Sequence, residues 1–129
     1  MTKVSRSKLN PKDLNLILNE LWEDLSLLDN PTSIKTFLKP FFSPTEPIMF
    51  AKRLEILKRL RKNHPYEEIM GDLKVTPNTV SKMNNVLHLA EEEFLEILDR
   101  LIESQKKREK KGAKKDYSRP SKRFWPVKH

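Results

Sequence analysis

Apolar residues recur at spacings of three and four along most of the chain, and this period predicts helices. The first apolar stripe follows Pro11 and consists of Leu14, Ile17, Leu18, Leu21, Trp22, Leu25 and Leu28. Asn30 and Pro31 are expected to end this helix. A short second helix is predicted in the segment TSIKTFLKPFF, where Pro40 limits its length.

The segment SPTE, Ser43 to Glu46, is a capping box that predicts the start of a third helix, which extends to about Asn63. Pro47 leaves the first residue of this helix open, because proline disfavours helical geometry at the residue before it. The expected apolar side consists of Ile48, Phe50, Leu54, Leu57 and Leu60. The other face contains Lys52, Arg53, Lys58, Arg59, Arg61 and Lys62.

The dipeptide His64-Pro65 interrupts the pattern, and two short helices are predicted at about residues 66–72 and 77–88. The last helix begins in AEEEFLEILDRL and ends in a basic segment, so that its charges complement the helix macrodipole. No segment alternates in the manner of a strand. The sequence therefore predicts an all-α fold of six helices.

The helices are predicted to form one domain over residues 11–111, between a disordered basic arm at 1–10 and a disordered basic tail at 112–129. The apolar stripes of the first and last helices are larger than a monomer of this size is expected to bury. A homodimer would bury them. The alternative is a single compact six-helix core in one chain.

Composition excludes several classes of protein. No apolar run is long enough to span a membrane, and residues 1–14 lack the apolar core of a signal peptide, so a cytoplasmic protein without membrane contact is expected. The chain has no cysteine and only two glycines, which excludes thiol chemistry and glycine-rich phosphate loops. His64, His88 and His129 have no metal-ligand spacing and no triad partners. We expect neither an enzyme nor a bound metal or cofactor.

The formal net charge of +8 belongs to the end of the chain. Residues 105–129 contain 11 of the 26 basic residues and only 2 of the 18 acidic residues, which leaves the preceding 104 residues close to neutral. Net charge alone therefore does not make the helical domain a nucleic-acid-binding protein.

The segment YEEIMGDLKVTPNTVSKMNNVL predicts a helix-turn-helix, which needs two short helices, a tight turn and a few apolar inward positions. Those inward positions are Ile69, Leu73, Val75, Val80 and Met83. Thr76 can cap the second helix and Pro77 suits its first position, which places the turn at LKVT. Lys74 stands where glycine is common, because the backbone there is often left-handed.

The outward residues of the second helix can hydrogen-bond bases and phosphates. With the capping residue they are Thr76, Asn78, Thr79, Ser81, Lys82 and Asn85. No Asp or Glu lies between Lys74 and Leu87, as a surface that faces phosphates requires. We therefore predict contact with double-stranded DNA. The alternative is that these polar residues only solubilise a short helix, because the same motif also occurs in protein-interaction modules.

Residues 28–102 resemble the Trp repressor superfamily, including its shorter members of unassigned function. The resemblance rests on the order of IKTFLKPFF, SPTE, AKRLEILKRLRKN and EEIMGDLKVTPNTVSKMNNVL before an acidic-to-apolar last helix. TVSKMNNVL is similar to the recognition-helix signature of the family. The resemblance implies an all-α, intertwined homodimer that binds a palindromic operator and regulates transcription as a repressor does.

In the tryptophan-responsive members of this superfamily, arginines hold the carboxylate of the amino acid. Arg53 falls at the expected arginine of the central helix, whereas Lys82 replaces the partner arginine. Met83 stands where a small residue is expected, and Val86 stands where a hydroxyl is expected. We therefore predict no tight tryptophan binding. Arg53 stays a candidate effector or phosphate contact, with a solvated basic face as the alternative, and a small-molecule corepressor is left open.

The tail combines basic residues with Tyr117, Phe124 and Trp125, which favours nucleic-acid contact through counterion release and stacking. Its candidate contacts are Lys114, Lys115, Arg119, Lys122 and Arg123. The alternative is a solubilising tail whose aromatic residues bind protein. A second hypothesis for the whole chain follows, a helical adaptor or RNA-associated protein that binds mainly through this tail.

Overall fold

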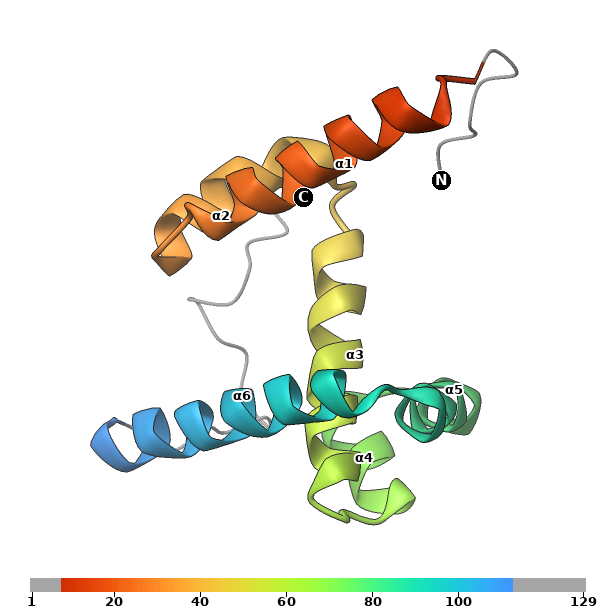
Figure 1. The fold of residues 1–129 in the computed structure, drawn as a ribbon. Helices are drawn as coiled ribbons and strands as arrows, with labels where there is room; N and C mark the ends of the chain where they lie inside the picture. Colours follow the sequence, from red (N-terminus) through yellow and green to blue (C-terminus); the bar gives the residue numbers. More distant parts are fainter. Residues whose placement is uncertain (1–7, 113–129) are drawn as a thin grey trace. The chain divides into compact units, whose positions relative to one another are not determined.

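The computed structural model describes residues 8–112, and the regular elements there are all helices, without any strand (Figure 1). They are α1 (Pro11–Ser26), α2 (Pro31–Leu38), the 3-10 helix η1 (Lys39–Phe41), α3 (Glu46–Arg61), α4 (Tyr66–Leu73), α5 (Pro77–Leu89) and α6 (Glu92–Lys111). The predicted all-α fold of six helices is confirmed for this part of the chain. The predicted disorder before Lys8 and after Gly112, and the tail contacts Lys114, Lys115, Arg119, Lys122 and Arg123, lie outside the described residues.

The chain divides into two compact units, Met1–Phe42 and Ser43–His129, and each is described by itself. In the first unit, α1 ends at Ser26, where the Leu27 and Leu28 amides bond back to carbonyls one turn earlier. Asn30 does not end α1, as the sequence predicts, but begins α2. Its Oδ1 accepts from the Ser33 amide at 2.9 Å, which makes it an N-cap followed by proline.

Most of the apolar residues described in the first unit are exposed. Figure 1 shows the chain reversing direction between α1 and α2, and neither helix contains a buried residue. Trp22 is 59% exposed and Ile17 is 55% exposed. The unit therefore has apolar periodicity without a core of its own.

The second unit begins with half of the predicted capping box. The Ser43 amide donates to Glu46 Oε1 at 2.7 Å, and this hydrogen bond lowers the pKa of Glu46. The helix itself begins at Glu46, three residues after Ser43. Pro47 lies in the first turn of α3, where its missing amide hydrogen costs no hydrogen bond.

The core of the second unit lies around the C-terminal half of α3, where α4, α5 and α6 converge (Figure 1). One buried cluster consists of Ile56, Ile69, Leu73 and Val80, and the other of Leu57, Leu98 and Ile102. Ile56 is fully buried although the predicted apolar side omits it, and Phe50, which that side includes, is 65% exposed. The buried side of α3 therefore differs from the predicted one, since α4 and α5 pack against Ile56.

The basic residues of α3 do not form the separate face that the sequence suggests. Lys58 and Arg59 are buried. Lys58 Nζ donates to Gln105 Oε1 of α6 at 2.8 Å, and Arg61 bonds both carboxylate oxygens of Asp99 at 2.9 and 3.0 Å. The hydrogen bond from Arg61 lowers the pKa of Asp99. Hydrogen-bonded cations thus tie α3 to α6 on the side where solvated charges were expected.

Candidate nucleic-acid interface

The turn between α4 and α5 has the left-handed residue that the motif requires. Lys74 has φ 55° and ψ 55°, so it occupies the position that often contains glycine. Its carbonyl oxygen accepts a hydrogen bond from Lys52 Nζ at 3.4 Å. Lys52 therefore joins the central helix to the turn. Sequence reasoning missed this contact, because the two residues lie 22 positions apart and no local pattern connects them.

Thr76 caps α5 as predicted. Its Oγ1 accepts from the Thr79 amide at 3.3 Å, and Pro77 occupies the first helical position. The Thr76 and Thr79 hydroxyls also lie 3.0 Å apart and share a hydrogen bond. These two hydroxyls therefore have an internal role, which reduces their availability to a ligand relative to the other predicted contacts.

The five predicted inward positions all point into the core. Ile69, Leu73 and Val80 are buried, and Val75 and Met83 pack against them. Met83 also packs against the cluster that includes Leu98, so its side chain contacts both parts of the core. The helix-turn-helix prediction is confirmed at these positions.

The outward face of α5 is polar and open. Asn78, Ser81, Lys82 and Asn85 are exposed, whereas Thr79 is half-buried. Within residues 8–112, the first four form no hydrogen bond or ion pair through their side chains. No acidic residue lies in α5, although Glu67 and Glu68 begin α4 and Glu91 to Glu93 begin α6. The face can therefore donate and accept hydrogen bonds beside a polyanion without local repulsion from its own helix.

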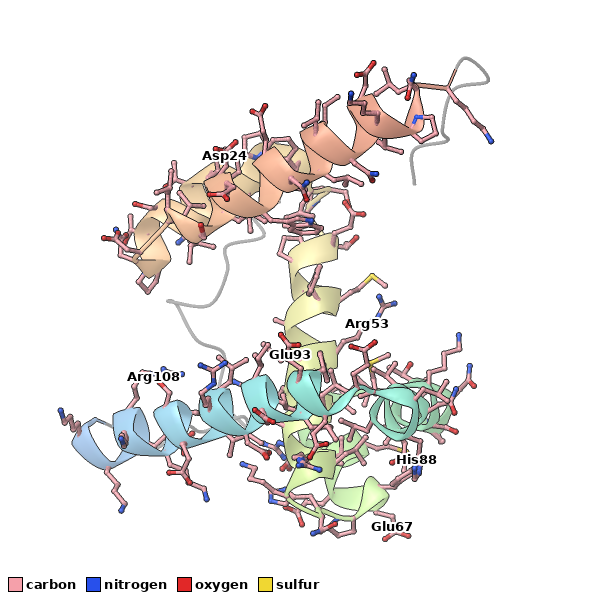
Figure 2. The ribbon with its side chains drawn as sticks, viewed as in Figure 1. Asp24, Arg53, Glu67, His88, Glu93 and Arg108 are labelled. Atoms are coloured by element: carbon pink, nitrogen blue, oxygen red, sulfur yellow. The ribbon has the colours of Figure 1, made fainter. Side chains whose placement is uncertain are left out.

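Arg53 is exposed on α3, and Figure 2 shows it projecting on the side where α5 lies. The two residues that bear on tryptophan binding differ in burial. Met83 is half-buried between α3, α5 and α6, and Val86 is 40% exposed. The Met83 side chain thus packs against both core clusters, whereas the Val86 side chain is open to solvent.

The part of the chain that the structure describes contains neither a cluster of metal ligands nor a membrane-spanning helix. No group of three or more His, Asp or Glu residues there could hold a metal ion. None of the helices described is both long enough and apolar enough to cross a bilayer.

Comparison with known proteins adds one finding. The family described as Trp repressor protein matches residues 17–102, which is more than half of the chain. This range includes α2 to α5, most of α1 and the apolar half of α6. Neither the curated proteins nor the solved structures contain a match to the chain.

Proposed function

The chain belongs to the Trp repressor family, and we propose that it is a sequence-specific, repressor-like transcriptional regulator that inserts α5 into the major groove of duplex DNA. Family membership suggests a DNA-binding helical regulator. The finer proposal rests on one observation: Asn78, Ser81, Lys82 and Asn85 are exposed on a helix without any acidic residue, in a chain that is 34% charged. In this proposal Thr76 and Thr79 contribute mainly by shaping the start of α5 and its approach to phosphates.

We further propose that the protein acts as a homodimer. The exposed apolar residues of α1 and α2 support this, because burying side chains such as Ile17 and Trp22 against a partner is favourable. A two-fold dimer would present two copies of α5 to two half-sites, so a palindromic operator is expected.

Tryptophan is not the proposed effector. Met83 contacts both core clusters, so an indole ring beside α5 would compete with a packed side chain. The Val86 side chain has no group that could accept a hydrogen bond from an ammonium. Titration calorimetry with L-tryptophan should therefore show no binding in the micromolar range, and micromolar binding would contradict this part of the proposal. Arg53 stays a candidate contact for a phosphate or for another anionic effector.

The double variant Asn78→Glu/Lys82→Glu tests the role of α5. It places two carboxylates on the face that should meet phosphates, and we expect duplex binding to be lost. The control Lys12→Glu/Asn15→Glu makes the same residue changes on exposed positions of α1 and should retain binding. Fluorescence anisotropy with duplex DNA measures both. Undiminished binding by the α5 variant would instead favour an adaptor or RNA-associated protein that binds through its tail.

Deletion of the residues after Gly112 tests the tail separately. If Lys114, Lys115, Arg119, Lys122 and Arg123 contact phosphates, the deletion should flatten the dependence of DNA affinity on salt concentration. Anisotropy titrations at several salt concentrations provide the slope. An unchanged slope would remove the tail from the proposed interface.

A further inference from the structure

Arg59 of α3 is a buried arginine, with 7% of its surface exposed. Arginine is almost never buried to this extent unless it is paired. Its position at the centre of the second unit therefore needs a local reason, and the family match does not supply one.

The guanidinium of Arg59 bonds a carboxylate on each side. Its Nη1 lies 2.6 Å from Asp72 Oδ2 of α4, and its Nε lies 3.3 Å from Glu55 Oε2 one turn earlier on α3. Asp72 is the penultimate residue of α4, two positions before the left-handed Lys74. The shorter of the two bonds thus fixes the end of α4 that leads directly into the turn.

Stability alone is a weak explanation for this arrangement. The Asp72 side chain is 44% exposed, and an ion pair that is partly open to water adds little to the free energy of folding. A short charge-assisted hydrogen bond differs from apolar packing because it is directional and restricts the distance and angle between its two groups. Arg59 therefore determines the position of α4 along α3 more narrowly than the Ile56 and Ile69 contact can.

We propose that Arg59 is a positioning residue, which binds Asp72 to set where α4, the turn and hence α5 lie against the central helix. The inference rests on the proposed function, because its consequence is the aim of the α5 polar face toward a duplex. The turn transmits the position, since it contains only three residues and Lys52 bonds the carbonyl of one of them, Lys74.

The direction in which Asp72→Ala changes DNA affinity distinguishes a positioning role from an effect of net charge. Asp72→Ala removes a negative charge, so electrostatics alone predicts tighter binding to any DNA. Positioning predicts the opposite for the preferred sequence, because a displaced α5 loses base contacts. Glu67→Ala is the matched control, since Glu67 lies on the same helix, is exposed and bonds no described residue (Figure 2).

The test uses the full chain, a duplex that it selects from a random pool, and a scrambled duplex of equal length. We expect Asp72→Ala to weaken binding to the selected duplex about tenfold, the size expected for loss of one good base contact. Binding to the scrambled duplex should stay equal or become tighter. Glu67→Ala should leave the ratio of the two affinities unchanged, and Asp72→Glu should recover part of it.

Each other outcome overturns the inference in a distinguishable way. If the parent chain selects a duplex and Asp72→Ala keeps the same affinity ratio as Glu67→Ala, Arg59 does not position α5. If the parent chain binds no duplex, the proposed function fails and the inference fails with it. Circular dichroism follows the fold at the assay temperature, and Asp72→Asn replaces Asp72→Ala if the latter unfolds. If both Asp72→Ala and Asp72→Asn lose helical structure, the Arg59–Asp72 bond is needed for folding, and its role as a positioning contact is overturned.

Discussion

The α1–α2 region and the α3–α6 region have similar apolar periodicity but opposite burial. Both contain leucine-rich stripes at helical spacing, yet Ile56, Ile69 and Val80 of the second region are completely buried, while no residue of α1 or α2 is. The difference lies in the number of partners. Three helices meet α3, whereas the first region offers α1 only one other α-helix. Periodicity therefore identifies a helix, and crossing partners decide whether its apolar face becomes a core.

We expect the two regions to have different roles. The α3–α6 region positions the polar face of α5 through its own contacts. The α1–α2 region has an exposed apolar surface. In the proposed homodimer, a second copy of the chain buries this surface. Four predictions test these differences between the two regions.

The burial contrast is tested by truncating one isoleucine in each region. Ile69→Ala should lower the free energy of unfolding by about 3 kcal/mol, because it removes buried methyl groups and leaves a cavity. Ile17→Ala should lower it by less than about 0.5 kcal/mol at the lowest usable protein concentration, where the side chain is exposed. Urea denaturation at several concentrations measures both. Equal losses of unfolding free energy in the two variants at low protein concentration would contradict the difference in burial.

Trp22→Asp tests whether a second copy of the chain buries the apolar surface of α1 and α2. If a second copy buries this side chain, a carboxylate there should raise the dimer dissociation constant at least about tenfold. Asp24→Ala, an exposed polar position on the same helix, should leave the dissociation constant unchanged. Sedimentation velocity over a concentration series distinguishes the two results. A parent chain that stays monomeric would remove the dimer from the account.

The turn offers a change that should stabilise the second region. Lys74→Gly relieves a left-handed backbone that costs a lysine more than a glycine, and we expect a gain of about 0.5–1 kcal/mol. The bond from Lys52 survives, because it ends on the main-chain carbonyl. Thermal and urea unfolding provide the measurement. Destabilisation would mean that the Lys74 side chain has a role that its backbone conformation does not reveal.

The smallest effect concerns the exposed ion pair between α3 and α6. The hydrogen bond from Arg61 keeps the pKa of Asp99 below its ordinary value. The pair's stabilisation is therefore complete above the pKa of Asp99 in the unfolded chain, about 3.9, and is lost as pH falls through the lower folded value. NMR titration should show the Asp99 pKa rising in Arg61→Ala and staying depressed in Arg100→Ala. An unchanged value in both variants would mean that Arg61 does not hold this carboxylate.

The sequence was sufficient around the turn between α4 and α5, where the signals are local. The cap at Thr76, the start of α5 at Pro77 and the left-handed Lys74 all follow from short motifs whose chemistry acts within four residues. The inward positions of α4 and α5 were also predictable from the sequence, because the helix-turn-helix motif determines their spacing.

Contacts between distant segments were not predictable in this way. The Arg59–Asp72 and Lys58–Gln105 bonds join residues 13 and 47 positions apart on different helices, and the sequence does not show whether a basic residue on α3 is solvated or buried. Ile56 was missed for a related reason, because the stripe through Phe50, Leu54 and Leu57 fits a helical period equally well. The helices that pack on α3 determine which side is buried.

In the proposed mode of binding, α5 of each subunit in a dimer recognises a specific duplex sequence. Selection of bound sequences from random duplex DNA by the full chain tests it most directly. We predict a palindromic consensus with two half-sites about one helical turn apart, and loss of that consensus in Asn78→Glu/Lys82→Glu. Recovery of no enriched sequence, or of the same consensus by the variant, would contradict it.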